Sequence, residues 1–256
     1  NSRSLPEVSI VDMRDELDAG NRSIFSRKLL EELEANIRNG QQSILFLNRR
    51  GYSTFVLCRK CGFVIKCRHC DVSMTYHHNS KKLLCHYCGY RIRNPDRCPS
   101  CGSDRIRYFG AGTQKVEEEV MKNVNGALVV RMDMDTTSGR NSHEKILSCF
   151  KEGKANVIVG TQMIAKGHDF PNVTFVGVIA ADFSLHSGDF RSSERTFQLL
   201  TQVSGRAGRA ELPGRVVVQT YEPDNFAIKA AALQDYEKFY LQEIIVREKL
   251  KYPPFC

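Results

Sequence analysis

Eight cysteines lie in two short segments, CRKCGFVIKCRHC (residues 58–70) and CHYCGYRIRNPDRCPSC (residues 85–101). They form four Cys-x-x-Cys pairs within 44 residues: Cys58/Cys61, Cys67/Cys70, Cys85/Cys88 and Cys98/Cys101. Two such pairs supply the four thiolates of a tetrahedral, structural Zn²⁺ site. Glycine, which suits a tight turn because it has no Cβ, follows three pairs, and Asp71 follows the other. The segments predict a small module built around two zinc ions.

The spacing of the pairs favours one of the three ways to combine them. Only five residues separate the first two pairs, which leaves little chain to turn one pair toward the other. Fourteen residues separate the second and third pairs, close to the usual spacing of a zinc ribbon. We therefore expect a nested arrangement with two sites. The inner site is Cys67, Cys70, Cys85 and Cys88, and the outer site is Cys58, Cys61, Cys98 and Cys101.

Two alternatives to this arrangement are less favoured. Disulfide bonds are one, but Cys-x-x-Cys pairs in a chain that shows no signal peptide are typical of metal sites. The other is a single mixed site that uses neighbouring histidines, although the eight cysteines already suffice for two ions. The histidines concerned are His69, His77, His78 and His86.

Outside the cysteine segment, short apolar runs alternate with helical patterns. Apolar runs predict strands at 8–11, 44–47, 127–130, 157–159, 173–179 and 216–218, and helical spacing or flanking signals predict helices at 24–38, 113–124, 142–151 and 226–250. Fully apolar strands that alternate with helices are typical of a parallel sheet covered on both faces. We therefore expect a discontinuous α/β domain at 1–57 and 102–222, interrupted by the module at 58–101 and followed by a helical segment at 223–256.

Charge points to an anionic partner. The chain carries a formal net charge of +8 and has a pI near 9.0. Nine lysines and arginines against two aspartates give the cysteine module +7 of this charge, and two Zn(Cys)₄ centres would reduce the module to about +3. Such a balance favours nucleic acid as a partner, with a solvated charged surface as the plainer reading. No run of about 18 apolar residues predicts a membrane span.

Two further segments carry motifs of another kind. The first is VIVGTQMIAKGHDFP at 157–171, where an apolar strand ends in Gly160 and a loop follows. The second is QVSGRAGR at 202–209, where Arg206 and Arg209 are three residues apart. On one helical face, two guanidinium groups so placed can clamp phosphoryl oxygens and neutralise developing charge. Paired arginines alone are more often salt-bridge partners, but the two segments together favour a nucleotide-driven motor.

These segments resemble motifs V and VI of superfamily-2 helicases, and the whole chain resembles one family within it. The stretch LFLNRRGY (45–52) running into the cysteine cluster, RMDMDTT (131–137) and YPPF (252–255) are similar to the PriA family of bacterial replication-restart, or primosomal, helicases. Met134 stands where that family leads us to expect arginine, which leaves its role open. The resemblance implies a RecA-like C-terminal helicase lobe, lobe 2, with a two-zinc insertion.

The resemblance also implies roles for individual residues. Arg209 corresponds to the arginine finger, with Arg206 beside it at the phosphates and Gln202 near the nucleotide or the hydrolytic water. Gly167 and Asp169 correspond to residues that line the nucleotide cleft. Thr161 and Gln162 correspond to residues that contact the single strand or link it to the cleft, and the aromatic side chains of the module are candidates for stacking.

In function, the resemblance implies ATP-driven 3′→5′ DNA unwinding at stalled forks and reloading of the replicative helicase. ATP and Mg²⁺ would serve the complete enzyme. Expected partners are single-stranded and forked DNA, single-strand-binding protein and primosome loading proteins, with a monomer in the bacterial cytoplasm, at the nucleoid. No G-x-x-x-x-G-K-[ST] phosphate loop is present, so the chain alone is expected to lack ATPase activity. The alternative is a zinc-ribbon adaptor without catalysis.

Overall fold

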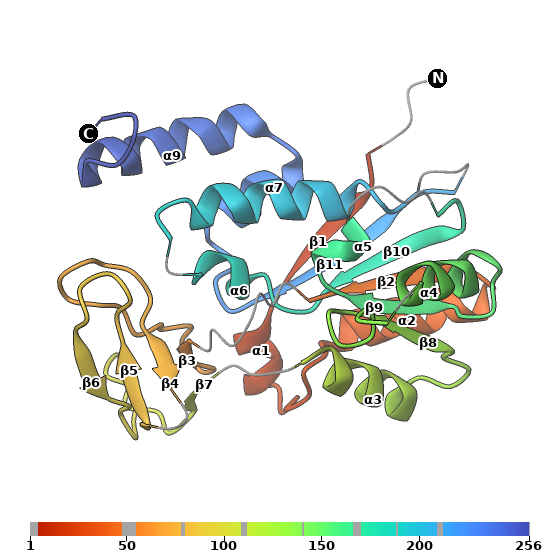
Figure 1. Cartoon of the computed structure of the whole chain (residues 1–256), viewed down its shortest axis with the longest axis horizontal. Coiled ribbons are helices and arrows are strands. Elements are labelled where there is room, and N and C mark those ends of the chain that lie inside the picture. Colours follow the sequence, from red (N-terminus) through yellow and green to blue (C-terminus); the bar gives the residue numbers. More distant parts are fainter. Residues whose placement is uncertain are drawn as a thin grey trace.

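The computed structural model describes residues 5–47, 55–77, 80–108, 112–139, 141–165, 170–187, 189–208 and 212–255. Within them, a six-stranded sheet forms the centre of the larger domain, with the strand order β1-β11-β10-β2-β9-β8 (Figure 1). The strands are β1 (Glu7–Asp12), β2 (Gln42–Phe46), β8 (Val129–Met132), β9 (Val157–Gly160), β10 (Val173–Val178) and β11 (Arg215–Thr220). All neighbouring pairs are parallel, which confirms the predicted sheet.

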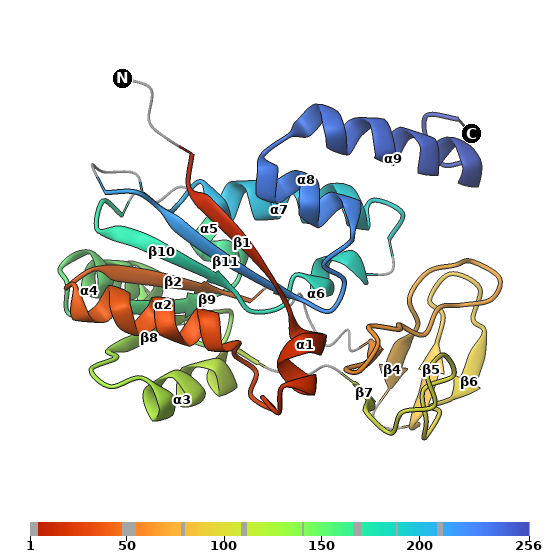
Figure 2. The same ribbon diagram turned by 180° about the vertical axis from the view of Figure 1, so that it is seen from behind.

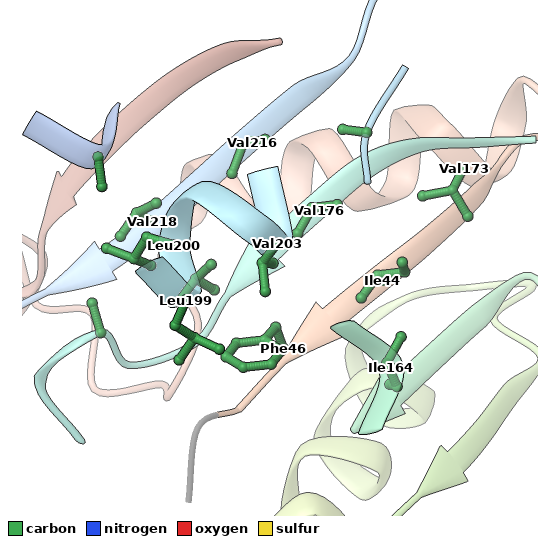
Figure 3. Close-up of a cluster of buried hydrophobic side chains, with 14 of the residues drawn as sticks. Ile44, Phe46, Ile164, Val173, Val176, Leu199, Leu200, Val203, Val216 and Val218 are labelled. Atoms are coloured by element: carbon green, nitrogen blue, oxygen red, sulfur yellow. The ribbon is translucent and has the colours of Figure 1, made fainter. Parts of the chain in front are cut away.

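Helices cover both faces of the sheet, as expected for strands that are apolar on both sides. One face packs against α1 (Met13–Asp18), α2 (Arg27–Arg38) and α3 (Thr113–Asn123). The other packs against α4 (Ser142–Lys151), α5 (Gln162–Ala165), α7 (Ser192–Ser204) and α8 (Phe226–Leu233). Successive residues of β2 alternate between the two cores, with Ile44 and Phe46 on the α7 side (Figure 3) and Leu45 on the α2 side.

Two helix predictions need correction. The helix expected from residue 24 begins at Arg27, because the Ser26 hydroxyl accepts a hydrogen bond from the Leu29 N–H and caps it there. The single helix expected at 226–250 is two helices, α8 and α9 (Tyr236–Leu250). Gln234 adopts φ +53° between them and Asp235 caps α9 through the N–H of Lys238, so the apolar pattern continues across a real break.

The cysteine module interrupts the larger domain between β2 and α3, where the sequence placed it. Its base is the antiparallel pair β3 (Val56–Cys58) and β7 (Ile106–Tyr108), and its body is a three-stranded sheet of β4 (Thr75–His77), β5 (Lys82–Leu84) and β6 (Arg91–Arg93). Figure 2 shows the module beside the end of the sheet where β1 leads into α1, on the same side as the short helix α6 (Asp182–Leu185). The exact domain boundaries stay a prediction.

Candidate metal centres and motor segment

The outer cysteine cluster joins the two ends of the module. Sγ atoms of its four members, Cys58, Cys61, Cys98 and Cys101, all lie within 4.8 Å of one another. Two of the sulfur pairs, Cys58 with Cys101 and Cys61 with Cys98, are 3.7 Å apart. Sulfurs at about 2.3 Å from a tetrahedral Zn²⁺ lie about 3.8 Å from one another, so the spacing fits zinc.

The inner cluster gathers Cys67, Cys70, Cys85 and Cys88 within the same limit, and Sγ of Cys67 lies 3.6 Å from Sγ of Cys88. All eight cysteines are free thiols. The structure thus groups them in the nested arrangement, and the described histidines belong to neither group. That each group holds a zinc ion stays a prediction, which the geometry fits.

One backbone pattern positions every cysteine pair. The residue after each second cysteine donates its N–H to the carbonyl of the first cysteine, at 2.8–2.9 Å, and has a φ between +53° and +76°. These four residues are Gly62, Asp71, Gly89 and Gly102. Glycine adopts this conformation without steric cost, and aspartate is among the few other residues that tolerate it. Asp71 therefore makes the same turn as the three glycines.

The thiols of the outer cluster differ in acidity. A hydrogen bond from the backbone N–H of Ser103 lowers the pKa of the Cys101 thiol to about 7, whereas burial raises the pKa of the Cys58 thiol to about 12. Zinc binds thiolates, so loading of this cluster releases protons, above all from the buried thiol.

The module contacts the larger domain beside the end of β11, at Tyr221. Nε of Arg59, which lies between Cys58 and Cys61 of the outer cluster, donates to the Tyr221 hydroxyl at 2.9 Å. Gly62 lies so near this segment that a Cβ there would come within 2.6 Å of the Tyr221 carbonyl oxygen. The outer cluster therefore packs directly on the main chain of the larger domain.

A buried histidine makes the second connection. His186, at the end of α6, is 8% exposed. Its Nδ1 lies 3.1 Å from the Ser73 hydroxyl of the module, and its Nε2 lies 2.7 Å from Oε1 of Glu222. Burial alone would raise the pKa of Glu222, but the hydrogen bond and the charge of His186 hold this pKa below its ordinary value. Ser73, His186 and Glu222 form a chain of polar contacts, called the joint below.

A buried carboxyl group, that of Asp182, connects α6 to the end of β11 and to the residue that follows it. Oδ1 of Asp182 accepts hydrogen bonds from the Thr220 hydroxyl and the Tyr221 N–H, both at 3.0 Å. The second oxygen, Oδ2, is buried and has no hydrogen-bond partner among the described residues. Burial raises the pKa of Asp182 to about 6.

The two motor segments, 157–171 and 202–209, include α5 and the end of α7, which pack on the same face of the sheet. Thr161 follows the carboxyl end of β9, and Gln162 begins α5. Gln202 lies exposed in the last turn of α7, and Gly208, beyond it, donates to the carbonyl of Val173 at the amino end of β10. The helix that begins at Gln162 and the helix that holds Gln202 therefore pack against each other in one buried cluster.

The prediction that Arg206 and Arg209 lie on one face of a helix is wrong for Arg206. The helix α7 ends at Ser204, and Arg206 lies in a turn where its N–H donates to the carbonyl of Val203. A close approach causes the turn, because a Cβ on Gly208 would lie 2.3 Å from the nitrogen of Gly214. Three further predicted residues lie outside the described residues, namely Gly167, Asp169 and Arg209.

Two family models match the chain. The PriA DNA helicase Cys-rich region domain matches residues 67–93, which contain the inner cluster. The helicase conserved C-terminal domain matches residues 102–211, which contain both motor segments.

Curated relatives match over almost the whole chain. The replication restart protein PriA of Bacillus subtilis is 59% identical over 255 residues, which cover 100% of this chain and 32% of the relative. The Synechocystis protein of the same name is 50% identical and covers 99% of this chain and 31% of the relative. The chain belongs to the PriA family. It spans about a third of the length of these curated relatives.

Solved structures add little to this PriA assignment. The S. cerevisiae Dbp5 L327V structure bound to RNA and ADP BeF3 aligns with 98% of this chain and 46% of that chain, at 15% identity. Its TM-score of 0.44 is too low to bear on the fold. The parallel sheet and the two family models establish the helicase C-terminal lobe with a cysteine-rich insertion, as the sequence predicted.

The joint of this PriA-family chain was not found from the sequence. Ser73 and His186 are 113 residues apart, and His186 and Glu222 are 36 apart, so no spacing rule connects them. Asp182 likewise follows an apolar strand without any motif. The one available signal was position, because polar residues after the ends of parallel strands gather at one edge of the sheet.

Proposed function

We propose that the chain is the second motor lobe and metal module of an ATP-dependent DNA helicase that unwinds 3′→5′, restarts stalled forks and loads the primosome. The family assignment and the match to a helicase C-terminal domain support this proposal. The observation that carries it is the combination, in one chain, of the Gly-Arg-x-Gly-Arg motor segment and a rigidly seated cysteine module. A plain adaptor would have no use for the former.

Within this proposal, the motor residues act on the nucleotide in the complete enzyme. Arg206 and Arg209 neutralise charge on the transferring phosphoryl group, and Gln202, Gly167 and Asp169 help to hold the nucleotide. Thr161 and Gln162 contact the DNA strand. ATP and Mg²⁺ belong to the complete enzyme, because the phosphate loop is not part of this sequence. The isolated chain is therefore inactive as an ATPase.

The metal module serves the proposed enzyme as a fixed platform. Two zinc ions, each held by four cysteines, supply the folding energy of the module. Its basic surface suits forked and single-stranded DNA, and single-strand-binding protein and primosome loaders are the proposed protein partners. We place the enzyme, as a monomer, in the bacterial cytoplasm at the replication fork. No helix among the described residues is long and apolar enough to cross a membrane.

The deciding experiment measures single-strand-stimulated ATP hydrolysis by the full-length protein and by this chain. In the full-length protein, Arg209→Ala should lower kcat about 10³-fold, as expected for an arginine finger, and Arg206→Ala should also lower it. Arg195→Ala is the matched control, since this exposed arginine of α7 pairs with Asp189, at 2.7 Å. The chain alone should hydrolyse no ATP above the blank.

Two results would contradict the proposal. Arginine-dependent turnover by the chain alone would show that it needs no other lobe. Full activity of the Arg209→Ala protein, with DNA binding that depends only on the cysteine module, would instead support the adaptor.

A further inference from the structure

Two histidines outside both cysteine clusters meet at the surface of the module. Nε2 of His77 lies 3.3 Å from Nε2 of His86, and the ring centroids are 5.3 Å apart with an angle of 53° between the planes. His86 is exposed and His77 is partly exposed, so solvent reaches the pair. Neither residue belongs to the clusters described above.

The main chain sets the separation of the two rings. His77 ends β4, which pairs with β5 in a register that places His77 opposite Lys82. His86 lies in the turn between Cys85 and Cys88, where Cys85 N–H donates to the carbonyl of Tyr90 and Gly89 N–H donates to that of Cys85. The backbone hydrogen bonds of β4 and of the cysteine turn thus fix the two positions of the main chain from which the side chains extend.

The separation of the two nitrogens matches the bite of a metal ion. Two imidazole nitrogens at 2.0–2.1 Å from a tetrahedral ion lie about 3.3 Å apart. A direct N–H···N hydrogen bond is the other arrangement that brings the rings together at this separation, and metal uptake distinguishes the two. Solvent reaches the pair, so water can supply further ligands.

We propose that His77 and His86 form a third metal site, which binds a divalent cation of the zinc class. Imidazole suits Zn²⁺ and its transition-metal neighbours better than Mg²⁺ or Ca²⁺. Water or another oxygen ligand completes the shell. The neighbouring inner cluster favours the cation, because a Zn(Cys)₄ centre carries a formal charge of −2. Lys82 opposes it. The site does not depend on the function proposed above.

Metal content after equilibrium dialysis tests the proposal. The chain, with both cysteine clusters loaded, is dialysed against micromolar Zn²⁺ and its zinc is counted. We expect three equivalents for the natural chain and two for His77→Asn and for His86→Asn. His69→Asn is the matched control and should keep three, since this exposed histidine of the same module contacts Arg68 and Tyr90 instead. Two equivalents in the natural chain, or three in both variants, would overturn the site.

Loss of the fold is recognised separately, because a collapsed module would hold fewer than two equivalents. In that case, NMR of the natural chain decides. Addition of the third equivalent should shift the ring signals of His77 and His86 together and leave those of His69 in place, and unchanged signals would refute the site. Lys82→Gln should tighten binding about threefold at low salt, because it removes a like charge from the residue opposite His77.

Discussion

The larger domain and the cysteine module are folded by different forces, although they share one chain. The domain buries two extensive apolar clusters, one on each face of its sheet. The module has nine buried residues in its core, and four of these are cysteines: Cys58, Cys67, Cys85 and Cys98. So few apolar side chains cannot hold about 50 residues by hydrophobic burial alone. The domain is therefore a product of packing, and the module a product of its metal.

Removal of zinc should give the largest difference between the two regions. A chelator, or Cys67→Ser, should unfold the affected part of the module, since structural zinc supplies about 10–16 kcal/mol of binding free energy in finger peptides. The sheet of the larger domain should stay folded. Hydrogen exchange of the two regions, measured with and without chelator, checks this. Equal loss of protection in β10 and β5 would show that packing and metal binding are not separable.

A core truncation should produce the opposite result. Leu45 is fully buried between the sheet and α2. We expect Leu45→Ala to lower the free energy of unfolding of the domain by about 2–5 kcal/mol, through lost burial and the cavity left behind. Urea unfolding measures the change, while zinc content should stay the same. Leu233→Ala, at a leucine that is 62% exposed, is the control and should change stability by no more than about 0.5 kcal/mol.

The carboxyl group of Asp182 gives a pH-dependent test of the segment where the two regions meet, because it accepts hydrogen bonds from Thr220 and Tyr221. Burial raises its pKa to about 6, so the folded protein binds this proton more tightly than the unfolded chain does. Its contribution to stability is therefore favourable at low pH and is lost as the pH rises from about 4 to about 6, by up to about 3 kcal/mol.

The variant Asp182→Asn should remove this pH dependence, because an amide can still accept both hydrogen bonds and never ionises. The measurement is the difference in unfolding free energy between natural protein and variant from pH 4 to pH 8, which cancels the other titrating groups. A difference that stays constant over this range would show that the pKa of Asp182 is not raised in the folded protein.

The smallest effect comes from a single methyl group at the contact between the regions. Gly62 and Gly89 both turn a cysteine pair, at φ +76° and +75°, but a Cβ on Gly62 meets the Tyr221 carbonyl at 2.6 Å and one on Gly89 meets nothing within 4 Å. Both alanine variants carry the same backbone strain. Gly62→Ala should lower the free energy of unfolding by about 1–3 kcal/mol more than Gly89→Ala does, because steric overlap with the Tyr221 carbonyl displaces the module from the larger domain. Amide exchange at Tyr221 and Glu222 reports it, and equal behaviour of the two variants would mean that the contact is loose.

Local patterns in the sequence were sufficient for most of the fold. Runs such as Val173–Val178 are apolar on both faces, and only a parallel sheet under two helical layers buries them. The five- and fourteen-residue spacings likewise favoured the nested cysteine groups, because a short connection cannot bring two pairs face to face. These features depend on neighbours in sequence, which a single chain displays.

Features that depend on distant contacts were not predictable. Gln234 adopts φ +53° inside the segment expected to be a single helix, and Gly208, just beyond the end of α7, passes close to Gly214. The joint is assembled from three segments by the finished fold. Resemblance assigned roles to Arg209, Gly167 and Asp169, but these residues lie outside the described parts of the chain, so their roles stay predictions.

The order of the strands has a consequence for the chain as it leaves the ribosome. The strand β1 pairs only with β11, and the inner strand β2 lies between β9 and β10, all of which are made later. The module, by contrast, closes on itself through β3 and β7 and through its two cysteine clusters, which join residues about 50 apart or fewer. Since short-range contacts form first, the module can take up metal and fold while the nascent sheet still lacks most of its strands. In each molecule, the inserted module can then reach its folded state before the domain into which it is inserted.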